Sequence, residues 1–368
     1  MQVPAFDITR QNETLKPSLE NVFQTVLQHG HFILGDEVRK FEEQMAAFVG
    51  TEHAITVANG SDALLLSLMA LGIGPGDEVI VPSFTFFATA GSVSRVGAVP
   101  VFVDVTAKDY NIDPEAVRRK ITSKTKAVIP VHLFGMPAKM DQLMQLASEY
   151  NLSIIEDAAQ ALDTVSGGNL VGNIGTLGCF SFFPTKNLGC FGDGGMVTTN
   201  RGDLAERLRM LRVHGTRRKY YHELLGINSR LDTLQAAFLN IKLPHVKNWI
   251  EKRRQIAAFY RQELAEISEI QLPAEDSGHS YNQFTIQVAE REQLREFLAA
   301  EGISSTVYYP LSLHLQPVFA SLGYRQGDFP VSEELTTKVL SLPMFPELNP
   351  EEQAYVIEKM KEFYRRKH

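Results

Sequence analysis

Hydrophobic residues recur along this chain in two patterns, which predict helices and strands in alternation. Within residues 36–49, Val38, Phe41, Met45 and Phe48 recur at helical spacing, which predicts an amphipathic helix. Short apolar runs separated by helical stretches follow, and because they are apolar on both sides they are typical of buried, mostly parallel strands. These runs are residues 78–81, 99–103, 127–131, 152–155, 179–182 and 196–199. The pattern predicts a βαβ sheet with helices on both faces.

After residue 199 the pattern changes to longer helices and fewer strands. We expect helices at residues 204–213, 230–243, 246–264 and 290–300, a last helix from Glu351, a loop at 273–279, and strands at 282–288 and 305–309. Pro244 should stop or kink the second of these helices, because proline cannot donate the helical hydrogen bond. We therefore expect a large α/β domain over residues 1–244 and a smaller α+β domain over residues 245–368.

Composition narrows the class of protein. The 368 residues are 44% hydrophobic and 21% charged, as in ordinary globular proteins. The formal net charge of -7 argues against a nucleic-acid binder, whose surface carries a basic stripe. The chain has no apolar run long enough for a bilayer and no evident signal peptide. Its two cysteines form no disulfide framework. We expect a cytoplasmic enzyme with no membrane or nucleic-acid partner.

The segment at residues 58–66 is a candidate phosphate site. Gly60 and Ser61 follow Asn59 and lead into an apolar, hence buried, helix. A helix that opens on a Gly-Ser turn presents free amide groups and a hydroxyl at the positive end of its dipole, which suits a phosphate. The alternative is that Asn59 or Ser61 only caps the helix.

Two carboxylates stand at the end of a predicted strand. Glu156 and Asp157 follow three apolar residues, and the carboxyl ends of parallel strands are where open α/β sheets bind ligands. A carboxylate there could bind a cationic ring nitrogen, a metal ion or a ribose. The alternative is a carboxylate at the start of a helix, facing water.

The segment at residues 179–200 carries a candidate nucleophile. Lys186 lies among apolar and aromatic residues, and loss of hydration disfavours a charged amine, which makes it reactive toward aldehydes. The glycines at 189, 192, 194 and 195 permit close approach of backbone to a ligand. The alternative is a solvated lysine. A basic cluster at residues 217–219 could meet phosphates or be a solvated loop.

A reactive lysine, a strand-end aspartate and a phosphate site form one coherent set. They supply the Schiff-base amine, the partner of the pyridinium nitrogen and the anion site that pyridoxal 5'-phosphate requires. The chain contains no G-x-G-x-x-G, no G-x-x-x-x-G-K-[ST] and no H-E-x-x-H, and we expect no metal.

Seven motifs along the chain resemble those of the DegT/DnrJ/EryC1/StrS family. In order they are ANGSDAL, VPSFTFFATA, VHLFGMPAKM, IIEDAAQAL, SFFPTKNLGCFGDGG, GINSRLDTLQAA and YYPLSLHLQPVF. The resemblance runs from about residue 6 to residue 364 and is specific through the conjunction of motifs. It implies a pyridoxal-phosphate-dependent sugar aminotransferase of fold type I, with a mostly parallel central sheet flanked by helices and a smaller C-terminal α+β domain.

The resemblance also implies roles for individual residues. Lys186 would form the Schiff base and Asp157 would pair with the pyridinium nitrogen. The remaining cofactor-binding residues would be Gln160 at the ring hydroxyl, Phe86 on the ring face, and Gly60, Ser61 and Ser181 at the phosphate. Asn228 would reach the phosphate in the neighbouring subunit, which requires a homodimer with composite active sites. His314 would line the sugar entrance, and His214 and Arg230 would also bind substrate.

Residues after the lysine point to the substrate. Asn187, Leu188, Gly189 and Asp193 resemble family members that act on 3-keto sugars, which implies amination of a nucleotide-linked 3-keto-6-deoxy-hexose with L-glutamate as donor. The stretches at 162–167 and Lys139 depart from the common family pattern, which leaves substrate detail open. The alternatives are a 4-keto-sugar aminotransferase, a regulatory protein that retains the fold, and a dehydratase, which in this family has histidine in place of the Schiff-base lysine.

Overall fold

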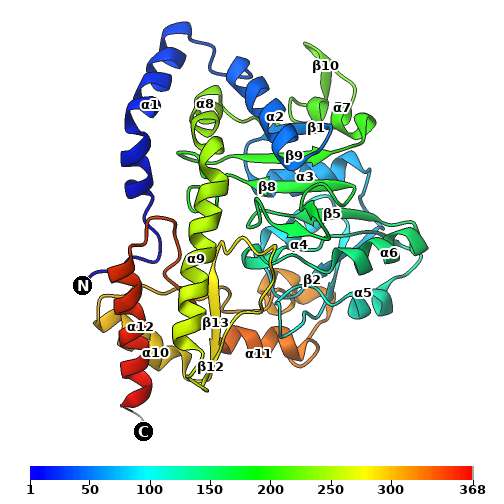
Figure 1. Ribbon diagram of the computed structural model, residues 1–368. Helices are drawn as coiled ribbons and strands as arrows, with labels where there is room; N and C mark the ends of the chain where they lie inside the picture. Colours follow the sequence, from blue (N-terminus) through cyan, green and yellow to red (C-terminus); the bar gives the residue numbers. More distant parts are fainter. Residues whose placement is uncertain (367–368) are drawn as a thin grey trace.

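The computed structural model describes residues 1–366 and is built around a seven-stranded sheet (Figure 1). The strand order is β1-β9-β8-β5-β4-β2-β3. Strand β9 runs antiparallel to both of its neighbours, and the other adjacent pairs are parallel. The strands are β1 (His53–Val57), β2 (Glu78–Pro82), β3 (Val99–Val103), β4 (Thr125–Val128), β5 (Ser153–Asp157), β8 (Leu177–Ser181) and β9 (Gly195–Thr199). The predicted mostly parallel sheet is confirmed.

Helices cover both faces of this sheet, as its sequence pattern predicts. In β2, Val79 and Val81 pack into the cluster beneath α3 and α4, while Ile80 packs into the cluster beneath α5 and α6. A strand buried on both faces is apolar at successive positions, which explains the continuous apolar runs. The helices around the sheet are α2 (Asp36–Val49), α3 (Gly60–Ala70), α4 (Ala88–Arg95), α5 (Pro114–Lys120), α6 (Met140–Tyr150), α7 (Gly202–Leu211) and α8 (Thr233–Lys242).

Pro244 separates two helices, as expected. Helix α8 ends at Lys242, a short 3-10 turn spans Leu243–His245, and α9 (Val246–Leu264) begins directly after it. Trp249 and Ile250 at the start of α9 pack against the large sheet, whereas Tyr260 and Leu264 near its end pack into the C-terminal cluster. Because α9 packs into the cluster of the large sheet and also into the C-terminal cluster, the domain boundary after residue 244 stays a prediction.

The C-terminal part is a smaller α+β unit. Its antiparallel sheet has the order β12-β13-β14. Its elements are β12 (Ile270–Gln271), β13 (Phe284–Val288), α10 (Arg291–Ala300), α11 (Pro330–Lys338), β14 (Val339–Leu342) and α12 (Pro350–Arg365). The first residues of the chain also join it, since Val3 pairs with Ile303 and lies in the same cluster.

The structure lacks one predicted strand and contains several elements that the sequence pattern did not predict. The strand expected at residues 305–309 is absent, because only Thr306 pairs there, with Ser341 in a single bridge. The pattern missed β1 and, in the C-terminal unit, β12, α11 and β14. It also missed the long helix α1 (Ile8–His29), which is polar over much of its surface and lies beside α8 (Figure 1).

Short elements complete the chain. They are the hairpins β6 (Val165–Ser166) with β7 (Asn169–Leu170) and β10 (Thr216–Arg218) with β11 (Tyr221–His222), and the 3-10 turns Leu133–Gly135, Leu313–Leu315 and Pro317–Leu322. Within residues 1–366, every helix is too short or too polar to cross a membrane.

Candidate active site

One cavity of about 420 Å³ gathers most of the predicted cofactor-binding residues. It lies where β5 and β8 end, at Asp157 and Ser181, beside the start of α3. Because β5 and β8 are parallel, their carboxyl ends meet at the same edge of the sheet. The predicted residues in its wall are Gly60, Ser61, Phe86, Asp157, Gln160, Ser181 and Lys186.

The start of α3 has the geometry that an anion site requires. The helix begins at Gly60, so the amides of Gly60 and Ser61 lie in its first turn, where the helix itself supplies no acceptor. Asn59 is the N-cap, and its Oδ1 accepts a hydrogen bond from the Asp62 amide at 2.8 Å, so the capping alternative holds for that residue. A Cβ at position 60 would stand 2.8 Å from the Ser181 Cβ. Glycine therefore lets the helix terminus and the Ser181 hydroxyl face one small space.

Lys186 lies half-buried in the same cavity. Burial lowers the pKa of its amine to about 8, and the nearby Asp157 carboxylate opposes this shift. A tight turn holds the residue, because the Lys186 amide donates to the Phe183 carbonyl at 2.9 Å. A Cβ at Gly189 would overlap the Pro184 carbonyl, so glycine is required for this turn to close. The amine is thus poised for nucleophilic and proton-transfer chemistry near neutral pH.

Asp157 is a buried carboxylate rather than a solvated one. Only 5% of the residue is exposed. Its Oδ2 accepts a hydrogen bond from the Thr89 Oγ1 at 2.8 Å, and its Oδ1 accepts one from the Ala159 amide at 3.2 Å. Burial raises the pKa of Asp157 above its usual range, while these hydrogen bonds and the Lys186 charge act in the opposite direction. Such a carboxylate has a strong preference for a cationic partner.

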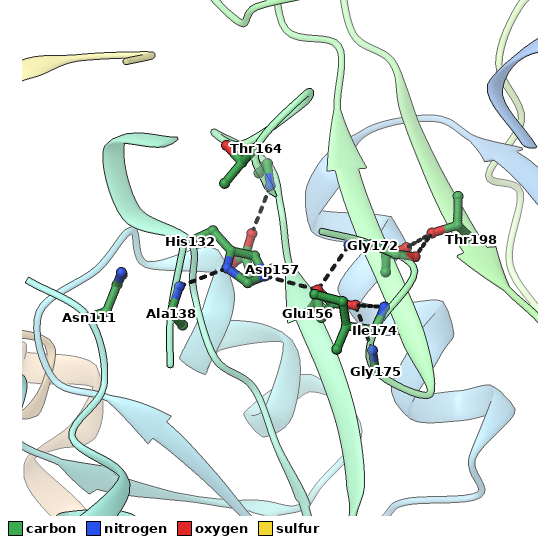
Figure 2. Close-up of polar contacts among 12 residues, drawn as sticks. Asn111, His132, Ala138, Glu156, Asp157, Thr164, Gly172, Ile174, Gly175 and Thr198 are labelled. Carbon is green, nitrogen blue, oxygen red and sulfur yellow. Dashed lines mark hydrogen bonds and ion pairs between the residues drawn. The ribbon is translucent and has the colours of Figure 1, made fainter. Parts of the chain in front are cut away.

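Glu156, the other candidate carboxylate, does not line the cavity and has a structural role, whose contacts Figure 2 shows. Its Oε2 lies 3.1 Å from the Nε2 of His132, and both side chains are fully buried. The Nδ1 of that ring accepts a hydrogen bond from the Ala138 amide, so the Nε2 carries the hydrogen that Glu156 accepts. The carboxylate also accepts hydrogen bonds from the amides of Gly172, Ile174 and Gly175. Glu156 therefore fixes a loop and is not available to a ligand.

Aromatic side chains form another wall of the cavity. Gln160 bridges the cavity wall, because its Nε2 donates to the Tyr309 hydroxyl at 3.0 Å and its Oε1 accepts from the Phe134 amide at 2.8 Å. Phe86 is 55% exposed, and its ring lies 6.2 Å from that of Tyr309. An exposed aromatic ring in a cavity wall is suited to stacking on a planar ligand.

Several wall residues were missed by the sequence reasoning. They are Thr85, Asn282, Gln283, Tyr308 and Tyr309, together with apolar neighbours. Tyr308 and Tyr309 belong to the segment that the pattern assigned to a strand. The signal that could have found them is the YYP sequence, because two tyrosines before a proline mark a turn rather than a strand interior.

His314 does not line this cavity. It is 1% exposed, and its Nδ1 lies 2.6 Å from the Ser83 Oγ and its Nε2 3.2 Å from the Glu333 Oε1. Burial lowers its pKa, while the Glu333 carboxylate opposes that shift. The structure thus places His314 in a buried hydrogen-bond chain outside this cavity, and its role at the sugar entrance stays a prediction.

Three other predicted residues also lie outside the cavity. His214 and Asn228 are exposed, and Arg230 is half-buried. Asn228 pairs with Val213 in a single bridge, in the segment that follows the β10–β11 hairpin. Its neighbour Ser229 accepts a hydrogen bond from the Ala58 amide at 3.0 Å, so this segment is anchored next to the start of α3. Their roles toward substrate or a partner's cofactor stay predictions.

Comparison with known proteins agrees with this geometry. Residues 13–361 match the DegT/DnrJ/EryC1/StrS aminotransferase family. The chain is 52% identical to a pleiotropic regulatory protein of Geobacillus stearothermophilus over 99% of each chain, and 46% identical to a UDP-N-acetyl-3-dehydro-alpha-D-glucosamine 3-aminotransferase of Acidithiobacillus ferrooxidans over 96% of each. A crystal structure of Streptomyces venezuelae DesV in complex with a ketimine intermediate superimposes with a TM-score of 0.96, at 44% identity and 98% coverage of both chains.

The chain therefore belongs to the DegT/DnrJ/EryC1/StrS family of aminotransferases, which depend on pyridoxal 5'-phosphate. The residues present fit this cofactor. The space that Gly60 leaves against Ser181 suits its phosphate, and the buried Asp157 suits its ring nitrogen. Lys186 supplies an amine whose lowered pKa favours reaction with its aldehyde.

Proposed function

We propose that this aminotransferase converts a nucleotide-linked 3-keto-6-deoxy-hexose to the 3-amino sugar, with L-glutamate as the amino donor. The observation that carries the proposal is the convergence of Lys186, Asp157 and the start of α3 on one cavity. Two relatives support the position of amination. The Acidithiobacillus relative is named as a 3-aminotransferase of a 3-dehydro sugar nucleotide, and a 44% identical Streptomyces relative as a dTDP-3-amino-sugar transaminase.

Each group of the site has one task in this reaction. Bound pyridoxal 5'-phosphate supplies an aldehyde for the amino group and a ring that withdraws electrons from the reacting carbon. Asp157 keeps its ring nitrogen paired with a negative charge. The Lys186 amine, once free, carries a proton between the two carbons that exchange the amino group. The first turn of α3 and Ser181 hold the phosphate, and Phe86 and Tyr309 keep the planar ring in place.

Residues after the lysine support the choice of carbon 3. Asn187 is buried. Its Nδ2 donates a hydrogen bond to the Leu162 carbonyl at 3.2 Å, and its Oδ1 accepts one from the Asn282 Nδ2 at 3.0 Å. Because Asn282 lines the cavity, Asn187 fixes its wall from behind. Asp193 lies in the wall itself. Asn187 and Asp193, which resemble the residues of family members that act on 3-keto sugars, thus lie behind or in the cavity wall.

The diphosphate of the nucleotide requires cations, and the β10–β11 hairpin offers them. Arg217, Arg218 and Lys219 are exposed, and Arg218 lies over the Tyr221 ring at 4.7 Å. Guanidinium groups bind phosphate oxygens in pairs, which suits a pyrophosphate. Arg230, His214 and His314 were expected to contact the substrate; of these, the first two are accessible in the described chain.

We also propose a homodimer, in which Asn228 reaches the phosphate of the partner's cofactor. Phe32, Ile33 and Leu34 are exposed together before α2, and Leu225 near Asn228 is 93% exposed. Exposed apolar residues in such groups are typical of protein interfaces. The location of the protein in the cell stays a prediction.

The reverse half-reaction tests the substrate. Purified enzyme carrying the cofactor is mixed with 3-amino or 4-amino nucleotide sugars, and the cofactor absorbance is followed. We expect conversion by 3-amino compounds. Conversion by 4-amino compounds alone would overturn the assignment to carbon 3, and no conversion by either would overturn the nucleotide-sugar substrate. Repeating the forward reaction with glutamate and other amino acids identifies the donor.

A regulatory role is a second candidate, favoured by the name of the Geobacillus relative. The complete set of Lys186, Asp157 and Ser181 argues for retained catalysis. Replacing the chromosomal copy with a Lys186→Ala variant separates the two. Loss of every associated phenotype means that the activity is responsible, whereas retention of a phenotype means that the folded protein acts without it.

A further inference from the structure

Thr89 is a buried residue of α4 that contacts the site without lining the cavity. It is 0% exposed, and its Oγ1 donates to the Asp157 Oδ2 at 2.8 Å. Its amide donates to the Phe86 carbonyl at 3.3 Å. One residue therefore holds both the carboxylate expected at the ring nitrogen and the backbone of the aromatic residue expected on the ring face.

The bond from Thr89 fixes the direction of the carboxylate. The Asp157 Oδ1 accepts from the Ala159 amide at 3.2 Å, so each oxygen has one fixed donor. One donor is the backbone amide of Ala159, and the other is a side chain of α4. Helix α4 is packed firmly on the sheet, because its Ala90 and Val93 lie in the same hydrophobic cluster as residues of β2. The carboxylate consequently has little freedom to rotate.

We propose that Thr89 is a positioning residue, which orients the Asp157 carboxylate for the ring nitrogen and favours its ionised form. The proposal rests on the role proposed for Asp157. A hydroxyl that donates to a carboxylate stabilises the charged state, and hydrogen bonds to charged groups are worth more than neutral ones. Thr89 carries no charge and does not line the cavity, so it acts through the residues that it contacts. Besides Asp157 and Phe86 these include Thr85, whose hydroxyl lies 3.5 Å from that of Thr89.

Other groups near Asp157 do not replace this contact. The titratable neighbours are Lys186, His132, Tyr309 and Cys179. The His132 Nε2 is committed to Glu156, and the Tyr309 hydroxyl accepts from Gln160. Burial raises the pKa of Asp157, and the Thr89 hydroxyl is the largest influence that lowers it. Removing that hydroxyl should raise the pKa of Asp157 further.

Thr89→Val tests the proposal, because valine keeps the shape of threonine and removes the hydroxyl. Thr89→Ser retains the hydroxyl and serves as the rescue. Ser92→Ala is the matched control on the same helix, since it deletes a buried hydroxyl that bonds the Thr89 carbonyl and not Asp157. Melting temperatures of the cofactor-free proteins establish that each variant folds.

The main measurement is binding of pyridoxal 5'-phosphate to cofactor-free protein between pH 5 and pH 9, a range of about two pH units on either side of neutrality. For Thr89→Val we expect a dissociation constant raised about tenfold near neutral pH, as for a lost hydrogen bond to a charged group. The acid limb of the binding profile should move to higher pH, because Asp157 would keep its proton longer. Thr89→Ser and Ser92→Ala should follow the wild type.

Turnover gives an independent readout. We expect Thr89→Val to lower kcat about tenfold and to leave the KM of the amino donor nearly unchanged, because the orientation of the ring matters most after the donor is bound. A folded Thr89→Val protein with wild-type binding profile and kcat would overturn the proposal, as would failure of Thr89→Ser to restore them.

Asp157→Asn separates this proposal from the one on which it rests. If Asp157→Asn loses most turnover while Thr89→Val behaves as wild type, the role of Thr89 is wrong and that of Asp157 stands. If Asp157→Asn itself turns over normally, the role proposed for Asp157 is wrong, and the role of Thr89 is overturned with it.

Discussion

The amine of Lys186 combines a reactive state with a fixed position. Its pKa of about 8 results first from lost hydration, and the turn at Phe183 holds its backbone. A fraction of the amine is therefore neutral near pH 7, which an exposed lysine would not be. We predict that borohydride fixes the cofactor covalently to Lys186, as read by mass spectrometry of the digested protein. Lys186→Ala should carry no fixed label, and a label at the wild-type level in that variant would contradict the assignment.

The same burial makes a prediction about stability. The folded-state pKa of Lys186 is depressed below its ordinary 10.5, so below about pH 8 the folded protein bears the cost of a buried charge. That cost disappears as pH rises from about 8 to about 10.5, because the folded state releases the proton first. Cofactor-free Lys186→Met should thus melt a few degrees higher than the wild type at pH 7, a shift typical of about 1 kcal/mol. The difference should vanish near pH 10.5.

A difference in melting temperature that is constant with pH would mean that packing of the methionine, and not the charge, is responsible. Lys242 provides the matched comparison, because burial also lowers its pKa to about 8 while its Nζ donates to the Gly189 carbonyl at 2.9 Å. Lys242→Met removes that hydrogen bond as well, so it should gain less stability than Lys186→Met or lose some.

At the scale of elements, the sequence predicts the helices and strands whose hydrophobic residues recur at a regular local spacing. The helix expected at residues 36–49 has those bounds in α2, and each predicted strand of the large sheet overlaps a real one. Asp157 was predicted because it stands at the end of a strand, and Lys186 because of its apolar and aromatic surroundings, both of which the local pattern reveals. Ser181 was predicted only from the family resemblance. The buried contacts of His314 could not be predicted, because its partner Ser83 is 231 positions away and only the folded chain brings the two together. Tyr308 and Tyr309 in the cavity wall were missed because their segment was assigned to a strand.

The buried chain of Ser83, His314 and Glu333 makes a prediction at this scale. It joins the end of β2, the turn Leu313–Leu315 and the start of α11. His314→Ala would leave Ser83 and part of Glu333 without a partner and would open a cavity beside Phe329, whose ring lies 4.7 Å from the imidazole. We expect a loss of about 2–4 kcal/mol in the free energy of unfolding.

Denaturant unfolding of the cofactor-free protein measures this loss. Ser83→Ala removes only the hydroxyl and should cost about 1 kcal/mol, as for a single hydrogen bond. A His314→Ala protein as stable as the wild type would show that the chain of hydrogen bonds contributes nothing. A large drop in sugar binding without a drop in stability would favour the sugar-entrance role that the family resemblance implies.

At the scale of the whole molecule, the site of one chain lacks a residue that the resemblance assigns to it. Asn228 lies outside the cavity, although Ser229 beside it is anchored to Ala58 next to the phosphate site of its own chain. A symmetric dimer can bring Asn228 of one subunit to the phosphate of the other, because a two-fold axis repeats every such contact. Each site would then combine Lys186 of one subunit with Asn228 of its partner.

Complementation between inactive variants tests this arrangement. In a mixed dimer of Lys186→Ala and Asn228→Ala subunits, one site would lack both residues and the other would have both. Random reassociation makes about half of the dimers mixed, so about a quarter of all sites should be active when cofactor is saturating. Subunits are exchanged in mild denaturant, and turnover is compared with each variant alone. Activity that never exceeds that of the separate variants would mean that Asn228 serves its own chain. A fully active monomer in light scattering would exclude composite sites altogether.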